Sequence, residues 1–194
     1  MPMPMPVPTD QLSGVQARTR AAILAATPAV LAADRTATMP DIAAAAGVGR
    51  TTLHRYFADR ERLVYEATLE SIRVLAEAVE QAATEQGSPI EAMRRLITAA
   101  VSVGDRILFL FGDPAILRSV APKDHPNDDR ILQLIKRGQR EGDFDSELSA
   151  SWIEHALFGL LLKGCQDSST GELPRHTVAP LIIRTLERGI RPTS

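Results

Sequence analysis

The 194-residue sequence lacks a long apolar segment and contains a single cysteine. A helix that spans a bilayer needs about 20 predominantly apolar residues, and no run in this sequence approaches that length. The lone Cys165 cannot form an internal disulfide bond, which fits a reducing compartment. We therefore expect a soluble, cytoplasmic protein with no membrane partner, in which Cys165 is a small buried hydrophobic residue.

The first residues also lack the features of a secretory signal. The Met-Pro repeat over residues 1–8 has neither a basic segment nor an apolar core. Proline at every second position removes helical hydrogen bonds and therefore prevents a helix there. We expect residues 1–16 to form a disordered tail.

Strand patterns are nearly absent. β-branched residues are scattered, and apolar positions recur at intervals of three and four residues rather than in alternation. This pattern predicts an all-α fold of about nine helices. The expected helices cover residues 18–33, 39–46, 50–57, 60–86, 89–111, 114–120, 129–140, 149–167 and 175–189. Pro28 lies inside the first of them and predicts a kink or a local break.

The distribution of helix lengths indicates two domains. We expect an N-terminal three-helix helix-turn-helix domain over residues 17–62 and a larger helical bundle over residues 63–194. Charge gives little guidance to the partner, because the net charge is −2. Residues 1–64 carry seven arginines against five acidic residues, an excess too small to identify a DNA-binding protein by itself.

Residues 38–63 have the pattern of two short helices around a glycine-containing turn. Thr38 is followed three residues later by Asp41, which predicts a capped helix start, and Gly47 suits the left-handed position that ends this helix. In the helix that follows, Leu53 and Phe57 lie four residues apart and are expected to face the core.

The outer face of this second helix then carries hydrogen-bond donors of the kinds that contact phosphates and base edges. These residues are Arg50, Thr51, Thr52, His54, Arg55 and Tyr56. Outside a helix-turn-helix, His54 and Arg55 would be interpreted as ordinary solvated residues of a helix.

The segment resembles the DNA-binding domain of the TetR family of bacterial transcriptional regulators. The resemblance covers residues 18–63, and its densest part consists of Ile42, Ala43, Gly47, Val48, Thr52, Leu53, Phe57 and Leu63. It implies a transcriptional regulator, not an enzyme, that binds double-stranded operator DNA as a homodimer. Because the family favours repression, it also implies a repressor of a palindromic operator that an unknown small-molecule effector releases.

The resemblance also implies which residues of this sequence contact DNA. The expected set is Thr38, Gly49, Arg50, Thr51, Thr52, His54, Arg55, Tyr56 and Arg60. Arg50 is the best candidate for reading guanine through its bidentate fork. Thr38, Thr52 and Arg60 are expected at phosphates. His54 and Tyr56 exchange the tyrosine and histidine that the family usually has, which leaves open which of them contacts phosphate.

The chain departs from the family pattern around the first helix. The usual glycine after this helix is missing, and Pro28 is unusual within it. Arg18 and Arg20 either reach DNA or are ordinary basic residues near a helix start. Pro40 occupies a position in the second helix that can carry a base-reading side chain, so base readout is expected to depend more on the third helix.

For the larger domain, the resemblance implies a homodimer formed by the last two long helices. The expected interface residues are Trp152, Ala156, Leu160, Val178, Leu181, Ile182 and Leu186, and the alternative is that they form intramolecular core. A pocket for a mostly apolar effector is expected within the bundle. Its candidate lining is Met93, Leu96, Ala100, Val103, Ile107, Phe111, Leu132, Ile135, His155 and Phe158, with plain core packing as the alternative role.

The competing interpretations are a helical-bundle enzyme and an adaptor without DNA binding. Catalytic signatures are missing, because there is no His-x-x-x-His pair, no G-x-S-x-G, no phosphate loop and no paired metal ligands. His125, His155 and His176 are far apart in sequence. We therefore expect no cofactor and no metal. An adaptor would leave the polar outer face of the second short helix unexplained.

Overall fold

The computed structural model describes residues 14–124 and 129–191, and within these ranges it contains only helices, turns and loops. The predicted all-α fold is confirmed. Residues 1–13 of the expected tail lie outside the described residues, whereas the residues from Gly14 onward belong to the first helix. Among the described residues, no helix has both the length and the apolar character needed to cross a membrane.

The chain folds as two compact units that divide between Ala67 and Thr68, inside helix α4 (Arg60–Gln81). The sequence predicts this boundary after residue 62, at the start of the same helix. Because α4 is continuous, its first residues belong to the N-terminal unit and the remainder to the C-terminal unit.

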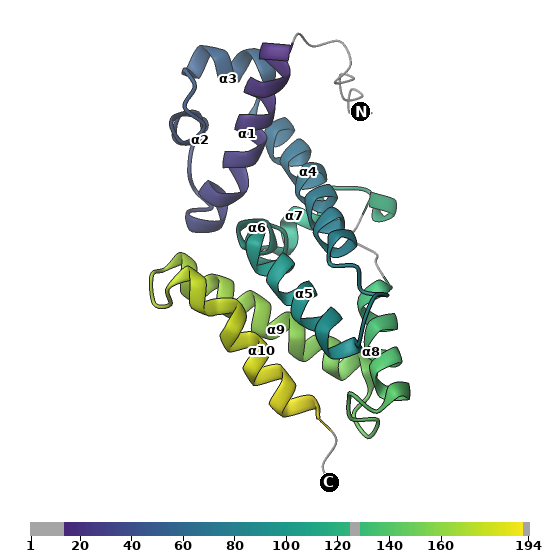
Figure 1. Cartoon of the computed structure of the whole chain (residues 1–194). Helices are drawn as coiled ribbons and strands as arrows, with labels where there is room; N and C mark the ends of the chain where they lie inside the picture. Colours follow the sequence, from purple (N-terminus) through teal and green to yellow (C-terminus); the bar gives the residue numbers. More distant parts are fainter. Residues whose placement is uncertain (1–13, 125–128, 192–194) are drawn as a thin grey trace. The chain divides into compact units, whose positions relative to one another are not determined.

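The N-terminal unit contains α1 (Gly14–Ala33), α2 (Met39–Ala45), α3 (Arg50–Tyr56) and the start of α4. Helix α2 packs against both α1 and α3 (Figure 1). The core of this unit consists of residues at helical spacing: Ile23, Leu24, Leu31, Ile42, Ala43, Leu53, Phe57, Leu63 and Ala67. The three-helix arrangement thus places α3 at the surface while its apolar side closes the core.

Helix α1 continues through Pro28 without a break. A proline inside a helix removes one hydrogen bond and clashes with the preceding turn. Here Pro28 is buried, and the neighbouring Thr27 is fully buried with its hydroxyl donating to the carbonyl of Ile23 at 2.8 Å. Thr27 and Pro28 are thus both buried in a continuous helix, and of the predicted kink or local break the break is wrong.

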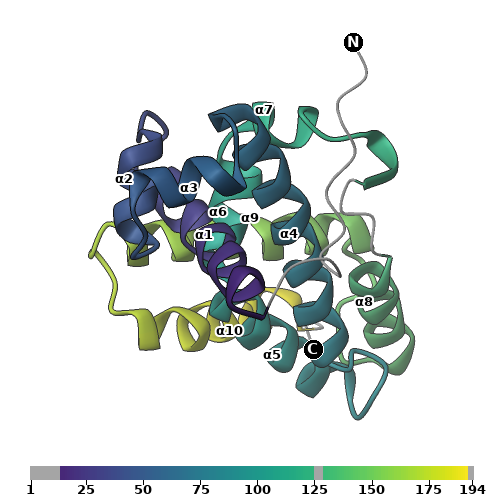
Figure 2. The same ribbon diagram turned by 90° about the horizontal axis from the view of Figure 1, so that it is seen from above.

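The C-terminal unit is a bundle in which α9 is the central helix. Its helices are α5 (Pro89–Ser102), α6 (Gly104–Gly112), α7 (Pro114–Arg118), the 3₁₀ helix η2 (Pro122–Asp124), α8 (Arg130–Glu141), α9 (Ala150–Ser169) and α10 (Arg175–Ile190). Helix α9 packs against α6, α8 and α10. Figures 1 and 2 both show α9 and α10 side by side along this unit.

The single helix predicted over residues 89–111 is two helices, α5 and α6. Val103 ends α5 with φ −109° and ψ 26°, outside the helical region. Gly104 then starts α6 in close contact with α9, because a Cβ atom at this position would lie only 2.8 Å from Sγ of Cys165. The apolar periodicity runs across this break, which is why the sequence predicts one helix. Cys165 itself is buried as expected.

Helix α4 ends at Gln81 rather than near residue 86, and two arginines hold the turn that follows. Carbonyl groups at a helix end have no donor inside the helix and need donors from elsewhere. Arg95 donates to the carbonyls of Ala82, Ala83 and Gln86, and Arg137 donates to those of Thr84 and Glu85. The end of α4 is therefore tied to α5 and α8 by two guanidinium groups.

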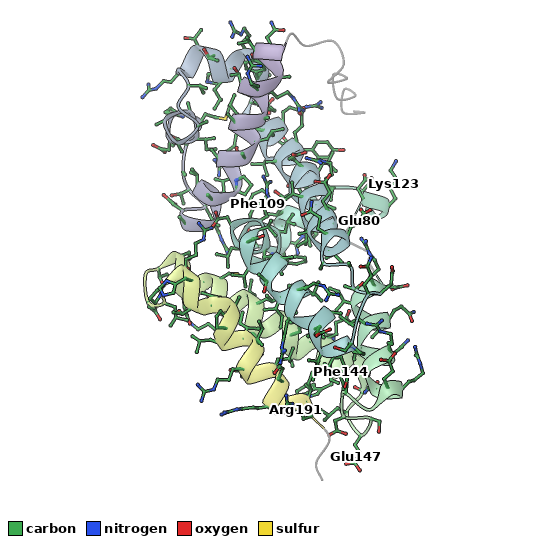
Figure 3. The ribbon with its side chains drawn as sticks, in the orientation of Figure 1. Glu80, Phe109, Lys123, Phe144, Glu147 and Arg191 are labelled. Atoms are coloured by element: carbon green, nitrogen blue, oxygen red, sulfur yellow. The ribbon has the colours of Figure 1, made fainter. Side chains whose placement is uncertain are left out.

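Gly138 of helix α8 lies directly against the aromatic ring of Phe144. Phe144 is only 1% exposed, and it lies in the loop after α8 (Figure 3). A Cβ atom on Gly138 would lie 2.1 Å from Cδ2 of the Phe144 ring. The missing side chain of Gly138 thus creates the slot that buries Phe144.

Candidate DNA-binding site and ligand cavity

Helix α3 has one buried and one exposed face. Leu53 and Phe57 are fully buried, as their spacing predicts. On the other side, the exposed residues are Arg50, Thr51, His54 and Arg55, and the half-buried residues are Thr52 and Tyr56. The helix therefore presents six candidate DNA-contacting side chains while two apolar residues anchor it.

The turn between α2 and α3 is built as the sequence predicts. Gly47 has φ +68°, the left-handed conformation that ends a helix, and the amide of Val48 donates to the carbonyl of Ala43 at 2.9 Å. Gly49 precedes α3 in an extended conformation with φ −73°. A Cβ atom on Gly49 would meet nothing within 4 Å, so the entry to α3 is open.

Thr38 is engaged within its own helix start. Its amide and its hydroxyl both donate to Oδ2 of Asp41, at 2.7 and 2.6 Å. These two bonds stabilise the ionised carboxylate and hold the pKa of Asp41 below its ordinary value of 3.8. The Thr38 hydroxyl gives its one hydrogen to Asp41 and thereby stabilises the start of α2, while its contact with phosphate stays a prediction.

Two arginines of α3 interact with neighbouring side chains. The positive charge of Arg50 contributes to the lowered pKa of Asp41, so opposite charges face each other across the turn. Arg55 places its guanidinium carbon 5.4 Å from the centre of the Tyr56 ring, within the range of a cation–π contact. Arg55 and Tyr56 thus contact each other on the exposed side of α3.

Arg60 makes internal hydrogen bonds that the sequence does not predict, and its phosphate contact stays a prediction. Its guanidinium donates to the carbonyls of Ala37 and Arg35, the latter at 2.7 Å. Both carbonyls belong to the loop between α1 and α2. Arg60 therefore ties this loop to the start of α4, a function that its position in the sequence did not reveal.

A buried ionic cluster that the sequence did not predict joins α1 to α4. Glu66 is 8% exposed and accepts hydrogen bonds from Arg20 of α1 and Arg62 of α4. The guanidinium carbon of Arg20 also lies 5.8 Å from the centre of the Phe57 ring. Arg20 is thus an internal contact, and only the four-residue spacing of Arg62 and Glu66 gives a sequence signal for the cluster.

The C-terminal unit contains a cavity of about 660 Å³. Five of the ten predicted pocket residues line it: Leu96, Ala100, Ile107, Phe111 and Phe158. The wall that the sequence missed comes from α4 and consists of Leu69, Ile72, Arg73, Leu75, Ala76 and Val79. Leu157 and Leu161 of α9 and Ile131 of α8 complete the apolar lining. The ring of Phe111 meets that of Phe158 edge-on, with centroids 4.7 Å apart.

Charged groups occur at a limited part of this lining. Arg73 is held by Glu70 and Glu77 on the same helix, and Lys123 and Asp124 of η2 and Arg130 of α8 also contribute. Figure 3 shows the Lys123 side chain extending away from η2 toward the outside of the bundle. Most of the cavity surface is therefore apolar.

The other five predicted pocket residues lie elsewhere. Met93 and Ile135 are 1% and 0% exposed and belong to the packed core. His155 is exposed on α9, so the prediction of a histidine inside the apolar stripe is wrong. Val103 lies at the break between α5 and α6, and Leu132 is half-buried on α8 without lining the cavity. One-dimensional periodicity did not resolve which side of each helix faces the cavity.

The predicted dimer residues separate into two groups. Val178, Ile182 and Leu186 are at most 4% exposed and belong to the core of their own chain, in agreement with the alternative given above for these residues. In contrast, Trp152 and Leu181 are 62% and 44% exposed. A surface groove of about 420 Å³ between α9 and α10 is lined by Leu148, Trp152, Ile153, Ala156, Gly159, Leu160, Thr185, Leu186, Gly189 and Ile190.

Taken with the fold, this geometry defines the class of protein: a helix-turn-helix DNA-binding regulator with a second, larger helical unit. Residues 23–67 match the family described as bacterial regulatory proteins, tetR family. Over 181 residues the chain is 34% identical to the HTH-type transcriptional repressor LfrR of Mycolicibacterium smegmatis, a match that covers 92% of this chain and 93% of LfrR. The chain therefore belongs to the TetR family and is a transcriptional regulator, not an enzyme.

Further comparisons agree with this assignment. The crystal structure of LfrR from Mycobacterium smegmatis superposes with a TM-score of 0.73 at 30% identity and covers 92% of this chain and 99% of that chain. The HTH-type transcriptional regulator NfxB of Pseudomonas aeruginosa is 29% identical over 139 residues, which cover 68% of this chain and 72% of NfxB. The likeness to LfrR thus extends over both units.

Proposed function

We propose that this regulator is a repressor that binds a palindromic operator as a homodimer and is released by a small, mostly apolar molecule. The observation that carries the proposal is that helix α3 has one buried face and one exposed face. Leu53 and Phe57 hold it in the core, and its solvent side carries hydrogen-bond donors. A B-DNA major groove admits an α-helix, and such donors read its base edges. The relative LfrR is a transcriptional repressor, which supports the direction of regulation.

The proposed DNA contact of each side chain is assigned from its exposure. Arg50 and Thr51 read bases, because they are exposed on the first turn of α3. Thr52 and Tyr56 contact phosphates, while His54 and Arg55 lie on the same side of the helix. Thr38 donates its hydroxyl hydrogen to Asp41 and Arg60 uses two of its N–H groups on loop carbonyls, so both residues support the DNA-reading elements in addition to their proposed phosphate contacts.

The proposed dimer uses the groove between α9 and α10. Trp152 and Leu181 are large apolar side chains left exposed on one chain, and the small residues Ala156 and Gly159 allow close approach of a helix. A two-fold axis would bring the same groove of a second copy against it. Two recognition helices of such a dimer can then reach successive major grooves about 34 Å apart.

The proposed effector site is the cavity of the C-terminal unit. One crystal structure shows LfrR in complex with proflavine, which supports a small-molecule effector for this relative of LfrR. Helix α4 supplies six lining residues, and its first residues belong to the N-terminal unit. We propose that an effector displaces α4 and so lowers the population of the DNA-binding arrangement. Because it acts on chromosomal DNA, the protein would work in the bacterial cytoplasm.

The DNA-binding proposal is tested by selecting fragments from a random double-stranded pool with purified protein at a stated salt concentration. Arg50→Ala and Tyr56→Ala are then compared with Arg140→Ala, an exposed arginine on α8 that serves as the control. Losing a base-reading arginine costs about 1–3 kcal/mol of operator binding and relaxes specificity at one position. Unchanged operator affinity in both α3 variants would refute the site, and failure to select any palindrome would refute operator binding.

The effector proposal is tested with proflavine as the first probe. We expect it to bind the protein and to release the selected operator fragment in an anisotropy titration. Ala100→Phe, which places a ring into the cavity, should abolish this response and leave operator binding in the absence of proflavine unchanged. A response that survives in Ala100→Phe would exclude this cavity as the site.

A further inference from the structure

We propose that Glu66 is a positioning residue for DNA recognition, which acts through Arg20 and Phe57 on the end of α3. Burial removes water from a carboxylate, so an ionised group at 8% exposure needs compensating partners. The structure provides two guanidinium groups: Arg20 donates to Oε2, and Arg62 donates to Oε1 at 2.5 Å. An ionic cluster of this kind is stable only when it is complete, because removing one member leaves a buried charge.

The cluster reaches the recognition helix through an aromatic ring. Phe57 directly follows the last residue of α3, and its amide donates to the carbonyl of Leu53 at 2.9 Å. The guanidinium of Arg20 lies over the Phe57 ring at a distance of 5.8 Å, within the range of a cation–π contact. Glu66 fixes the orientation of this guanidinium, so it also fixes the surface against which α3 ends.

A small tilt of α3 about its Phe57 end displaces the first turn of the helix. The helix has seven residues, and at a rise of 1.5 Å per residue it is about 10 Å long. A tilt of about 10° around its Phe57 end would displace its first turn by about 2 Å. A recognition site must be held to within about 0.5 Å, so such a tilt would take Arg50 and Thr51 out of reach of the base edges.

This role predicts a particular defect in binding. Base contacts depend on the position of α3, whereas phosphate contacts supply most of the sequence-independent affinity. Loss of the Glu66 cluster should therefore weaken operator binding and spare binding to unrelated DNA. It should also leave the salt dependence unchanged, because no phosphate contact is lost when Arg20 is an internal residue.

The test uses the full-length protein, the operator fragment selected above and a scrambled fragment of equal length. The variants are Glu66→Gln and Arg20→Lys, and Glu77→Gln is the control because Glu77 also pairs with an arginine of α4 but lies in the C-terminal unit. We expect Glu66→Gln to lower the operator-to-scrambled affinity ratio about tenfold, the equivalent of one base readout. Arg20→Lys keeps the charge but loses the planar group over Phe57, so its ratio should fall by a smaller factor. Glu77→Gln should match the wild type.

Three results would overturn the proposal. The first is a wild-type affinity ratio in Glu66→Gln, and the second is an equal loss of affinity for both fragments. The third is a decrease of about one in the salt-dependence slope of a further variant, Arg20→Gln, which removes the charge, because such a decrease would indicate a direct phosphate contact. If circular dichroism shows that Glu66→Gln is unfolded, Arg20→Lys decides, and an unchanged ratio there overturns the proposal. Failure of the wild-type protein to select an operator would instead refute the proposed function.

Discussion

Replacing Gly138 of α8 by alanine has two effects of opposite sign on the free energy of unfolding. Alanine is favoured over glycine inside a helix by about 1 kcal/mol. The added Cβ atom, however, would lie 2.1 Å from Cδ2 and 2.4 Å from Cε2 of Phe144. Ordinary carbon–carbon contacts are about 3.5–4.0 Å, so the ring must move by more than an ångström or the backbone must shift.

The steric clash should outweigh the gain in helix propensity, because Phe144 is 1% exposed and has little room to move. Overpacking of a core costs about 1–3 kcal/mol. Partial exposure of a phenylalanine adds to this, since its full burial contributes about 1.5–3 kcal/mol. After subtraction of the helix-propensity gain, we expect Gly138→Ala to lower the free energy of unfolding by about 1–3 kcal/mol.

Urea denaturation followed by far-ultraviolet circular dichroism measures this change. A second substitution, Phe144→Leu, serves as the control because it makes room for the new methyl group. The double variant should lose less stability than the sum of the two single variants, which is the sign of a direct steric coupling. An increase in stability on Gly138→Ala alone would refute the packing argument.

Three further outcomes follow from other sites. Trp152→Ala should raise the dissociation constant of the proposed dimer about tenfold or more in sedimentation equilibrium, and an unchanged constant would exclude the α9–α10 groove. Because the pKa of Asp41 is lowered in the folded protein, its contribution to stability is present above the ordinary value of 3.8 and is lost as the pH falls through the folded value. Asp41→Asn should thus flatten the decrease in stability below about pH 4, whereas an unaltered acid profile would contradict the Thr38–Asp41 bonds. Burial raises the pKa of Cys165 to about 11, so a disulfide reagent at about pH 8 should label it far more slowly in the native than in the denatured protein; equal rates would contradict its burial.

Local patterns predicted the DNA-binding unit well. Thr38, Asp41 and Gly47 determine a helix start and a helix end through groups only a few residues apart, so their roles are visible in the sequence. The spacing of Leu53 and Phe57 likewise predicts which face of α3 is buried. These patterns did not predict that Arg20 and Arg60 donate hydrogen bonds to groups within the protein.

The larger unit was harder to predict because its residues are apolar on several sides. The division at Val103 depends on the contact between Gly104 and Cys165, which are far apart in sequence. Helix periodicity finds the apolar side of a helix but does not tell which neighbour faces it. For this reason the α4 wall of the cavity was missed, and Val178 was assigned to an interface although it is buried in its own chain.

The cavity wall consists of residues under two different constraints. Positions on α5, α6 and α9, such as Ala100, Phe111 and Phe158, serve the C-terminal unit only. Helix α4 supplies the opposite wall, and the same helix places Leu63 in the core of the N-terminal unit. Under the proposed function, selection for a new ligand can therefore exchange the first group without altering the N-terminal core, whereas substitutions that alter the course of α4 would also affect DNA reading. Among relatives with different ligands, the cavity should diverge first on the side away from α4.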